Sequence, residues 1–83
     1  MNNFPSRETV IRIRENFPVG CRVELVLMND LYAPPFGTLG TVTGVDDAGS
    51  VMVNWDNGSS LSVVFGEDSC CRIRNFVDNN EKG

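Results

Sequence analysis

The chain has 83 residues, of which 41% are hydrophobic and 22% are charged, and its formal net charge is −4. A chain of this size buries about 63% of its unfolded surface, which is enough for one small core. These values argue against a membrane span, a multidomain enzyme and a strongly basic nucleic-acid binder.

The residue inventory also argues against an enzyme or a metal protein. The sequence contains no histidine, which is the commonest general base and metal ligand. The chain has three cysteines, Cys21, Cys70 and Cys71. Because their number is odd and their spacing is not CxxC, they predict neither a zinc site nor a disulfide framework. Free thiols and the absence of a signal-peptide pattern indicate the cytoplasm. We therefore expect no catalytic residues, no cofactor and no bound metal.

The first predicted element is a short helix over residues 6–16, preceded by a flexible N-terminus at residues 1–5. Ser6 is a suitable helix cap. Val10, Ile13 and Phe17 recur at i, i+3 and i+7, which places them on one apolar face. Pro18 then ends the helix, because proline cannot continue one.

Five short strands are expected after the helix, separated by turn residues. The first covers residues 21–28 and leads into a long loop, residues 29–37, which contains a Pro-Pro pair. In the second, Thr38–Asp46, strict alternation puts Val42 and Val45 on opposite faces, and a bulge near Gly44 would reconcile them. Turn signals at 47–49, 57–58 and 66–68 delimit the others, expected at 51–56, 61–65 and 71–74, with Ile73 facing inward.

These elements predict a mainly β fold, a five-stranded SH3-like barrel with one N-terminal helix. Closure into a barrel would remove the exposed edges of a small sheet. The apolar face of the helix would cover an open end or seam of that barrel. We expect one domain over residues 6–77 and a disordered polar tail at residues 78–83.

Two segments, residues 18–35 and 37–61, resemble a bacterial and phage family named domain of unknown function 4314. The most specific elements are Met28 with Asp30, the APP of 33–35, Gly37 with Gly40, the VDD of 45–47 and the WDNG of 55–58. Cys21 and the Cys70-Cys71 pair depart from the pattern. The resemblance implies a compact β-barrel found on phages, prophages and conjugative elements, and it carries over no catalytic residues.

Three carboxylates, Asp46, Asp47 and Asp56, could in principle bind a divalent cation. The spacing is shorter than that of a calcium loop, and no bidentate glutamate follows at the required interval. Side-chain bonds within turns, of the Asx type, are therefore the favoured interpretation for Asp47 and Asp56.

The aromatic residues are the clearest candidates for partner binding. Tyr32 and Phe36 lie on the long loop, where surface function and simple packing are both open. Trp55 and Phe65 are in phase with Val53 and Val63, which favours the core for both. Trp55 is nevertheless kept as a binding candidate, because long loops and strand aromatics often combine in SH3-like barrels.

The charge distribution favours a protein partner over a nucleic acid. No lysine or arginine occurs between Val23 and Cys71, so we expect a negative barrel surface that repels nucleic acid. A partner would be basic or apolar at the contact. The partner-binding candidates are Tyr32, Phe36, Trp55, Asp30, Asp46, Asp47 and Asp56.

An alternative site would use the basic residues near the two ends of the fold. Its candidates are Arg7, Ile11, Arg14, Arg72 and Arg74. If the arginines converged, they could support a nucleic-acid accessory role, and Ile11 with an open strand edge could support a weak homodimer instead of a monomer.

The function expected from the sequence is therefore a non-enzymatic protein-binding module, encoded by a phage or mobile element. A sharper hypothesis is an inhibitor of a host defence effector such as a CRISPR nuclease, because an acidic protein would associate rapidly with a basic groove. The alternative is the nucleic-acid accessory protein.

Overall fold

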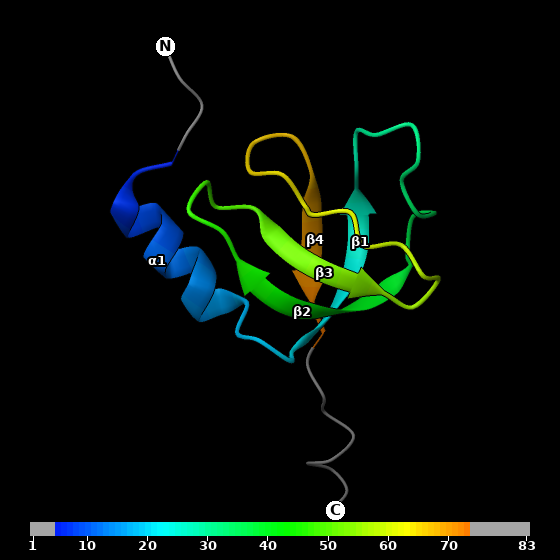
Figure 1. Ribbon diagram of the computed structural model, residues 1–83, viewed down its shortest axis with the longest axis horizontal. Coiled ribbons are helices and arrows are strands. Elements are labelled where there is room, and N and C mark those ends of the chain that lie inside the picture. Colours follow the sequence, from blue (N-terminus) through cyan, green and yellow to red (C-terminus); the bar gives the residue numbers. More distant parts are fainter. Residues whose placement is uncertain (1–4, 74–83) are drawn as a thin grey trace, which may run out of the picture.

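The computed structural model describes residues 5–73, and it shows one helix against an open antiparallel sheet (Figure 1). The elements in chain order are α1 (Arg7–Asn16), β1 (Arg22–Leu27), β2 (Leu39–Val45), β3 (Val51–Trp55) and β4 (Ser69–Arg72). The sheet order is β3-β2-β1-β4, and every pair of neighbours is antiparallel. The mainly β class with one N-terminal helix is therefore confirmed.

Helix α1 begins and ends where the sequence predicts. Ser6 is the N-cap, with extended backbone, and its hydroxyl accepts the Thr9 N–H at 3.1 Å. At the other end, the Phe17 N–H donates to the carbonyl of Ile13 at 2.9 Å, and Pro18 follows. The helix lies beside the turn that connects β2 to β3 (Figure 1).

The expected bulge in the second strand is confirmed. The pairing of β2 with β3 shifts register between Val42 and Gly44. As a result Val42 is fully buried, while Val45 is partly buried and packs against the same core. The extra residue absorbs the mismatch in alternation.

The expected strand at 61–65 does not form, and this is the main correction to the predicted barrel. Only Val63 pairs with β3, through two hydrogen bonds to Val51 of 3.0 and 2.8 Å. The next hydrogen-bonded pair would be Val53 with Leu61. However, the Leu61 carbonyl accepts the indole N–H of Trp55 at 2.8 Å. Beyond Val63 the chain turns, because the N–H groups of Glu67 and Asp68 both donate to the Val64 carbonyl.

The last strand begins earlier than predicted, and the side chain that it turns toward the core is not the one expected. Strand β4 covers Ser69–Arg72 instead of 71–74. Cys70 pairs with buried Leu25 and is the residue that faces the core, whereas Ile73 is exposed, against expectation. With β3 and β4 at the two edges of the sheet, the described residues form no closed barrel.

The core consists of the inward side chains of the three longer strands. Val23, Leu25, Val42, Val53 and Trp55 are buried. Ile13 of α1 and Phe17, the residue that caps this helix, pack against them. This confirms the apolar face of the helix and the core assignment of Trp55. The core assignment of Phe65 is wrong, because its side chain is 36% exposed.

The ends of the chain are only partly described. Of the N-terminal residues expected to be flexible, only Pro5 belongs to the described part, and it packs against Gly49. The expected tail at 78–83 lies outside the described residues. In residues 5–73, α1 is too short and too polar to cross a membrane.

A comparison of two glycines in β2 tests the core packing. A methyl group at Gly40 would lie 2.5 Å from Val53 Cγ1, 2.7 Å from Trp55 Cε3 and 3.0 Å from the backbone oxygen of Asn54. Gly40→Ala should therefore lower the free energy of unfolding by about 1–3 kcal/mol. At Gly44 the methyl would meet only the mobile end of Met52, so Gly44→Ala is the matched control. Denaturant unfolding that gives equal stability losses for the two variants would contradict this account.

Candidate binding surfaces

The loop between β1 and β2 is built from two consecutive turns. In the first, Ala33 N–H donates to the Asp30 carbonyl at 3.1 Å, and the Asp30 carboxylate accepts the Tyr32 N–H at 2.7 Å. In the second, the hydroxyl and the N–H of Thr38 both donate to the Pro35 carbonyl, at 2.6 and 3.1 Å. These hydrogen bonds constrain the backbone conformation of the loop, although the loop forms no strand.

The side chains at the tips of these turns are the most exposed large apolar residues of the loop. Leu31, Tyr32 and Phe36 are 88%, 79% and 77% exposed. Pro34, between the two turns, is buried and anchors the loop to the body of the protein. The loop therefore displays apolar side chains on a constrained backbone, which suits them to act as anchors at an interface.

Trp55 does not join Tyr32 and Phe36 at the surface. Its indole is 3% exposed, and its N–H bond to the Leu61 carbonyl is internal. Trp55 is therefore not exposed for contact with a partner. Its ring belongs to the core, and its N–H bonds the chain that follows β3.

Two of the candidate acids hold turns with their side chains. Asp30 accepts the Tyr32 N–H, as described above. Asp46 accepts the N–H groups of Ala48 and Ser50 at 3.0 and 2.9 Å, which shapes the turn into β3. Asp46 thus makes the turn bonds that the sequence led us to expect of Asp47.

The other two candidate acids pair with arginines from outside the acidic stretch. Asp47 accepts from Arg14 Nη2 at 2.9 Å, and the same guanidinium donates to the Val45 carbonyl. Asp56 forms a two-pronged pair with Arg22, whose hydrogen bonds hold the pKa of that carboxyl below its usual range. The turn interpretation is wrong for both, and the negative surface expected from the sequence is neutralised at these two points.

The alternative basic patch is dispersed. Arg7 and Ile11 are exposed on α1, and Arg14 is occupied by Asp47. Arg72 donates to the carbonyl of Asn16 at 3.4 Å, at the opposite end of the helix from Arg7, and Arg74 lies outside the described residues. Arg7 and Asn16, whose carbonyl Arg72 reaches, lie about 14 Å apart along the helix, so Arg7 and Arg72 do not share one surface.

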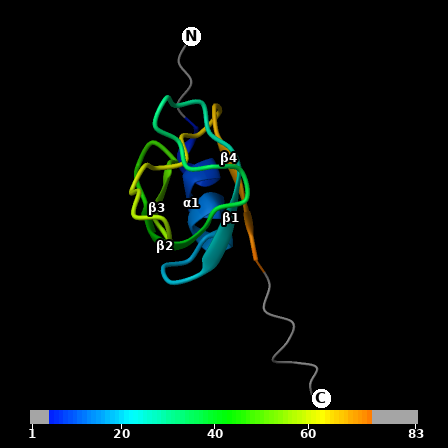
Figure 2. The same cartoon turned by 90° about the vertical axis from the view of Figure 1, so that its right-hand side faces the viewer.

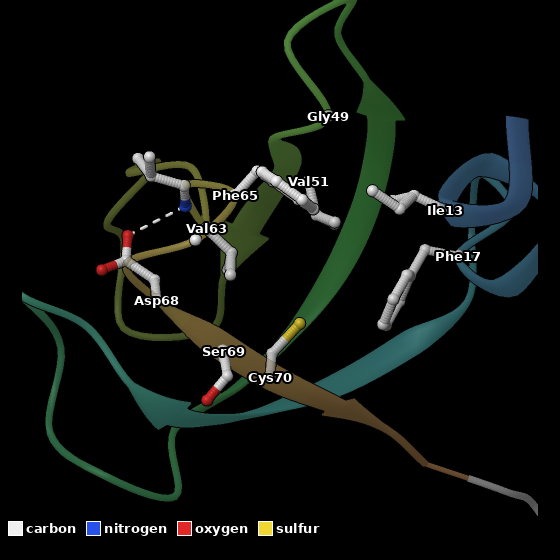
Figure 3. Close-up of a pocket in the computed structure, with 11 residues that line it drawn as sticks. Ile13, Phe17, Gly49, Val51, Val63, Phe65, Asp68, Ser69 and Cys70 are labelled. Carbon is white, nitrogen blue, oxygen red and sulfur yellow. Dashed lines mark hydrogen bonds between the residues drawn. The ribbon is translucent and has the colours of Figure 1, made fainter. Parts of the chain in front are cut away.

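A groove that the sequence did not reveal lies between α1, the segment 63–66 and β4 (Figure 3). It has a volume of about 290 Å³. Its apolar walls are Ile13 and Phe17 on one side and Val51, Val63 and Phe65 on the other, while Cys70 points into it (Figure 3). Residues 63–65, which were expected to belong to a strand, line one side of the groove instead.

Cys70 is poorly suited to act as a nucleophile in this groove. The pKa of its thiol is raised to about 11, mainly by burial and to a smaller extent by the neighbouring Cys71 and Cys21. The thiol is therefore protonated near neutral pH. No cluster of three or more metal-binding side chains occurs among residues 5–73.

Comparison with known proteins identifies a family but no characterised relative. The family model described as Domain of unknown function (DUF4314) matches residues 6–73, nearly all of the described structure. No curated protein and no solved structure matches the chain.

Thiol alkylation tests the placement of Cys70. In Cys21→Ser/Cys71→Ser, only Cys70 can react with iodoacetamide, and in Cys21→Ser/Cys70→Ser only the exposed Cys71 can react. At pH 8 we expect Cys70 to react at least about tenfold more slowly, because its thiolate is scarce. Mass spectrometry gives both rates, and denaturant should equalise them. Equal rates in the folded variants would contradict the burial of Cys70.

The pair of Arg22 and Asp56 should make stability depend on acid pH. Because the pKa of Asp56 is lower in the folded state, its contribution is complete above the unfolded pKa, about 3.9, and is lost as the pH falls through the folded value. Denaturant midpoints of wild type and Asp56→Asn should therefore differ at pH 7 and converge toward pH 2. A difference that stays constant over this range would rule out the ion pair as its cause.

Proposed function

The chain belongs to the DUF4314 family, and we propose that it is a non-enzymatic module that binds a protein partner through the loop between β1 and β2. The observation that carries the proposal is the exposure of Leu31, Tyr32 and Phe36 on a backbone held by turn bonds. Scattered exposed apolar residues are ordinary, but three within six positions of an ordered loop favour an interface.

The constrained backbone matters because it lowers the entropy lost on binding. Aromatic side chains have few rotatable bonds, and the turns at Asp30–Ala33 and Pro35–Thr38 already limit the main chain. A partner with an apolar pocket would gain contact area without having to order a flexible segment.

Carboxylates around the loop favour a basic rim on that partner. Asp30 lies within the first turn, and Asp68 accepts the Asn29 N–H at 2.8 Å where the loop begins. A Glu24 carboxylate oxygen lies 3.6 Å from the space that a Cβ on Gly37 would occupy. Opposite charge on the partner would accelerate association and orient it.

The wider role that we propose is that of a phage- or mobile-element-encoded protein acting in the bacterial cytoplasm as a monomer or weak homodimer. The support is the family resemblance together with the net charge of −4. An inhibitor of a host defence effector, such as a CRISPR nuclease, fits this role. Because Asp47 and Asp56 are neutralised by arginines, contact through the apolar loop fits better than mimicry of nucleic-acid charge.

We also propose that the fold is a reduced SH3-like barrel. The support is the order of the segments, in which Val63 lies beside β3, followed by β2, β1 and β4. In this view residues 61–65 are the vestige of the fourth of the five predicted strands, shortened to one bridge.

The nucleic-acid alternative has weaker support. Arg14, Arg22 and Arg72 each donate hydrogen bonds within the protein, and a backbone-tracking groove needs several free cations in a row. A gel shift at low salt with DNA and RNA tests this alternative directly, and we expect no retarded band.

Affinity capture with matched variants tests the proposed function. Immobilised wild type is compared with Leu31→Ser/Tyr32→Ser/Phe36→Ser and with a control, Ile11→Ser/Val19→Ser/Met52→Ser, which removes exposed apolar side chains elsewhere. Proteins recovered from bacterial lysate by wild type and control should be lost with the loop variant. For a purified partner, the loop variant should raise the Kd by about 30-fold or more.

Both variants should keep the thermal midpoint of the wild type within a few degrees, because every substituted side chain is exposed. Specific partners that bind the loop variant as well as the wild type would refute the proposal, as would the complete absence of partners.

A further inference from the structure

Strand β4 leaves one of its two edges without a neighbouring strand in the described part of the chain. It stands at the end of the sheet order, and β1 occupies its other side. The Ile73 N–H donates to the Arg22 carbonyl, and Glu24 pairs with Cys71, so these positions bond toward β1. Because antiparallel strands alternate, the backbone groups of Cys70 and Arg72 point away from β1.

The groove adjoins this open strand. Ser69 and Cys70 line it, and α1 and the segment 63–66 form its two walls (Figure 3). Figure 2 shows that β4 lies at one side of the molecule, where the sheet ends. Free strand backbone next to apolar walls is the combination that an added strand requires, because the backbone supplies affinity and the walls accept alternate side chains.

Opposite charges mark the two ends of the groove. At the Phe65 end Asp68 lines the groove, and Glu67, the residue before it in the chain, is exposed. At the Phe17 end, Arg72 reaches the carbonyl at the end of α1. An occupant would therefore be favoured if it carried a cation at the first end and an anion at the second.

We propose that the groove is a strand-acceptor site, in which an extended segment of a partner protein pairs antiparallel with β4. Alternate aliphatic side chains of that segment occupy the groove. A basic residue at its C-terminal end meets Glu67 and Asp68, and an acidic residue at its N-terminal end meets Arg72. The site is separate from the loop between β1 and β2, and the proposed loop interface does not depend on it.

The size of the groove selects a single strand. A segment of about five residues places two or three side chains on one face, which suits a groove of about 290 Å³ bounded on both sides. A second copy that paired through its own β4 would meet the same charges, but β4 (Ser69–Arg72) carries no aliphatic side chain and would leave the apolar walls at Val51, Val63 and Phe65 poorly covered. The chemistry therefore favours a foreign aliphatic strand over a symmetric dimer.

The test uses a synthetic peptide, acetyl-Glu-Val-Thr-Val-Thr-Val-Lys-amide, titrated to millimolar concentration against ¹⁵N-labelled full-length protein. We expect the amide signals of Ser69–Arg72 and of residues 63–66 to shift, and those of residues 30–36 to stay in place. The same peptide with N-methylated valines should cause no shift, because it cannot pair with β4. A charge-reversed peptide, with Lys first and Glu last, should bind about threefold more weakly.

A charge-reversed protein provides the matched control. Glu67→Lys/Arg72→Glu should prefer the charge-reversed peptide, and Glu67→Lys alone should lose the preference if the double variant does not fold. The proposal is overturned if neither peptide shifts these amides, if the N-methylated peptide binds equally well, or if the shifts lie elsewhere. Shifts at Ser69–Arg72 that depend on protein concentration alone, with a dimer in sedimentation, would assign the groove to a second copy and also overturn it.

Discussion

The indole of Trp55 decides how the second half of the chain is arranged. Its ring is buried against the bare backbone of Gly40, and its N–H takes the carbonyl of Leu61. The Leu61 carbonyl bonds the indole and not the N–H of Val53, which a longer ladder between β3 and residues 61–65 would require. The chain therefore pairs once, at Val63, and turns away. Beyond Val63, the segment 63–66 forms one wall of the groove, and β4 forms another side of it.

The charged residues of this protein mainly serve its own turns and strand ends. Asp46 and Asp68 each accept two backbone N–H groups, while Arg14 and Arg22 each neutralise an aspartate across the fold. Such exposed pairs contribute little stability individually, but they fix the directions in which the side chains point. The surface is consequently less uniformly acidic than the absence of lysine and arginine between Val23 and Cys71 suggests, and its most distinctive part is the apolar loop tip.

The two proposed interfaces differ in how they would be recognised. The loop between β1 and β2 presents side chains outward to a pocket on a partner, whereas the groove beside β4 receives side chains from one. They are carried by different elements, and Asp68 bonds both, because it accepts the N–H groups of Asn29 and Val64. A module with one projecting and one receiving surface could contact two partners, or one partner at two points.

Local patterns in the sequence determined the helix with its Ser6 cap, the first three strands, the bulge at Gly44 and the family. These features depend on neighbours within a few residues, or on alternation that a bulge corrects. Tertiary structure alone decided the loss of the strand at 61–65, the earlier start of β4, and the exposure of Phe65 and Ile73. It also decided that Asp47 and Asp56 pair with arginines more than thirty positions away along the chain. The reason is that several donors are candidates for the same carbonyl or carboxylate. Only the folded chain determines which of them lies within hydrogen-bond distance.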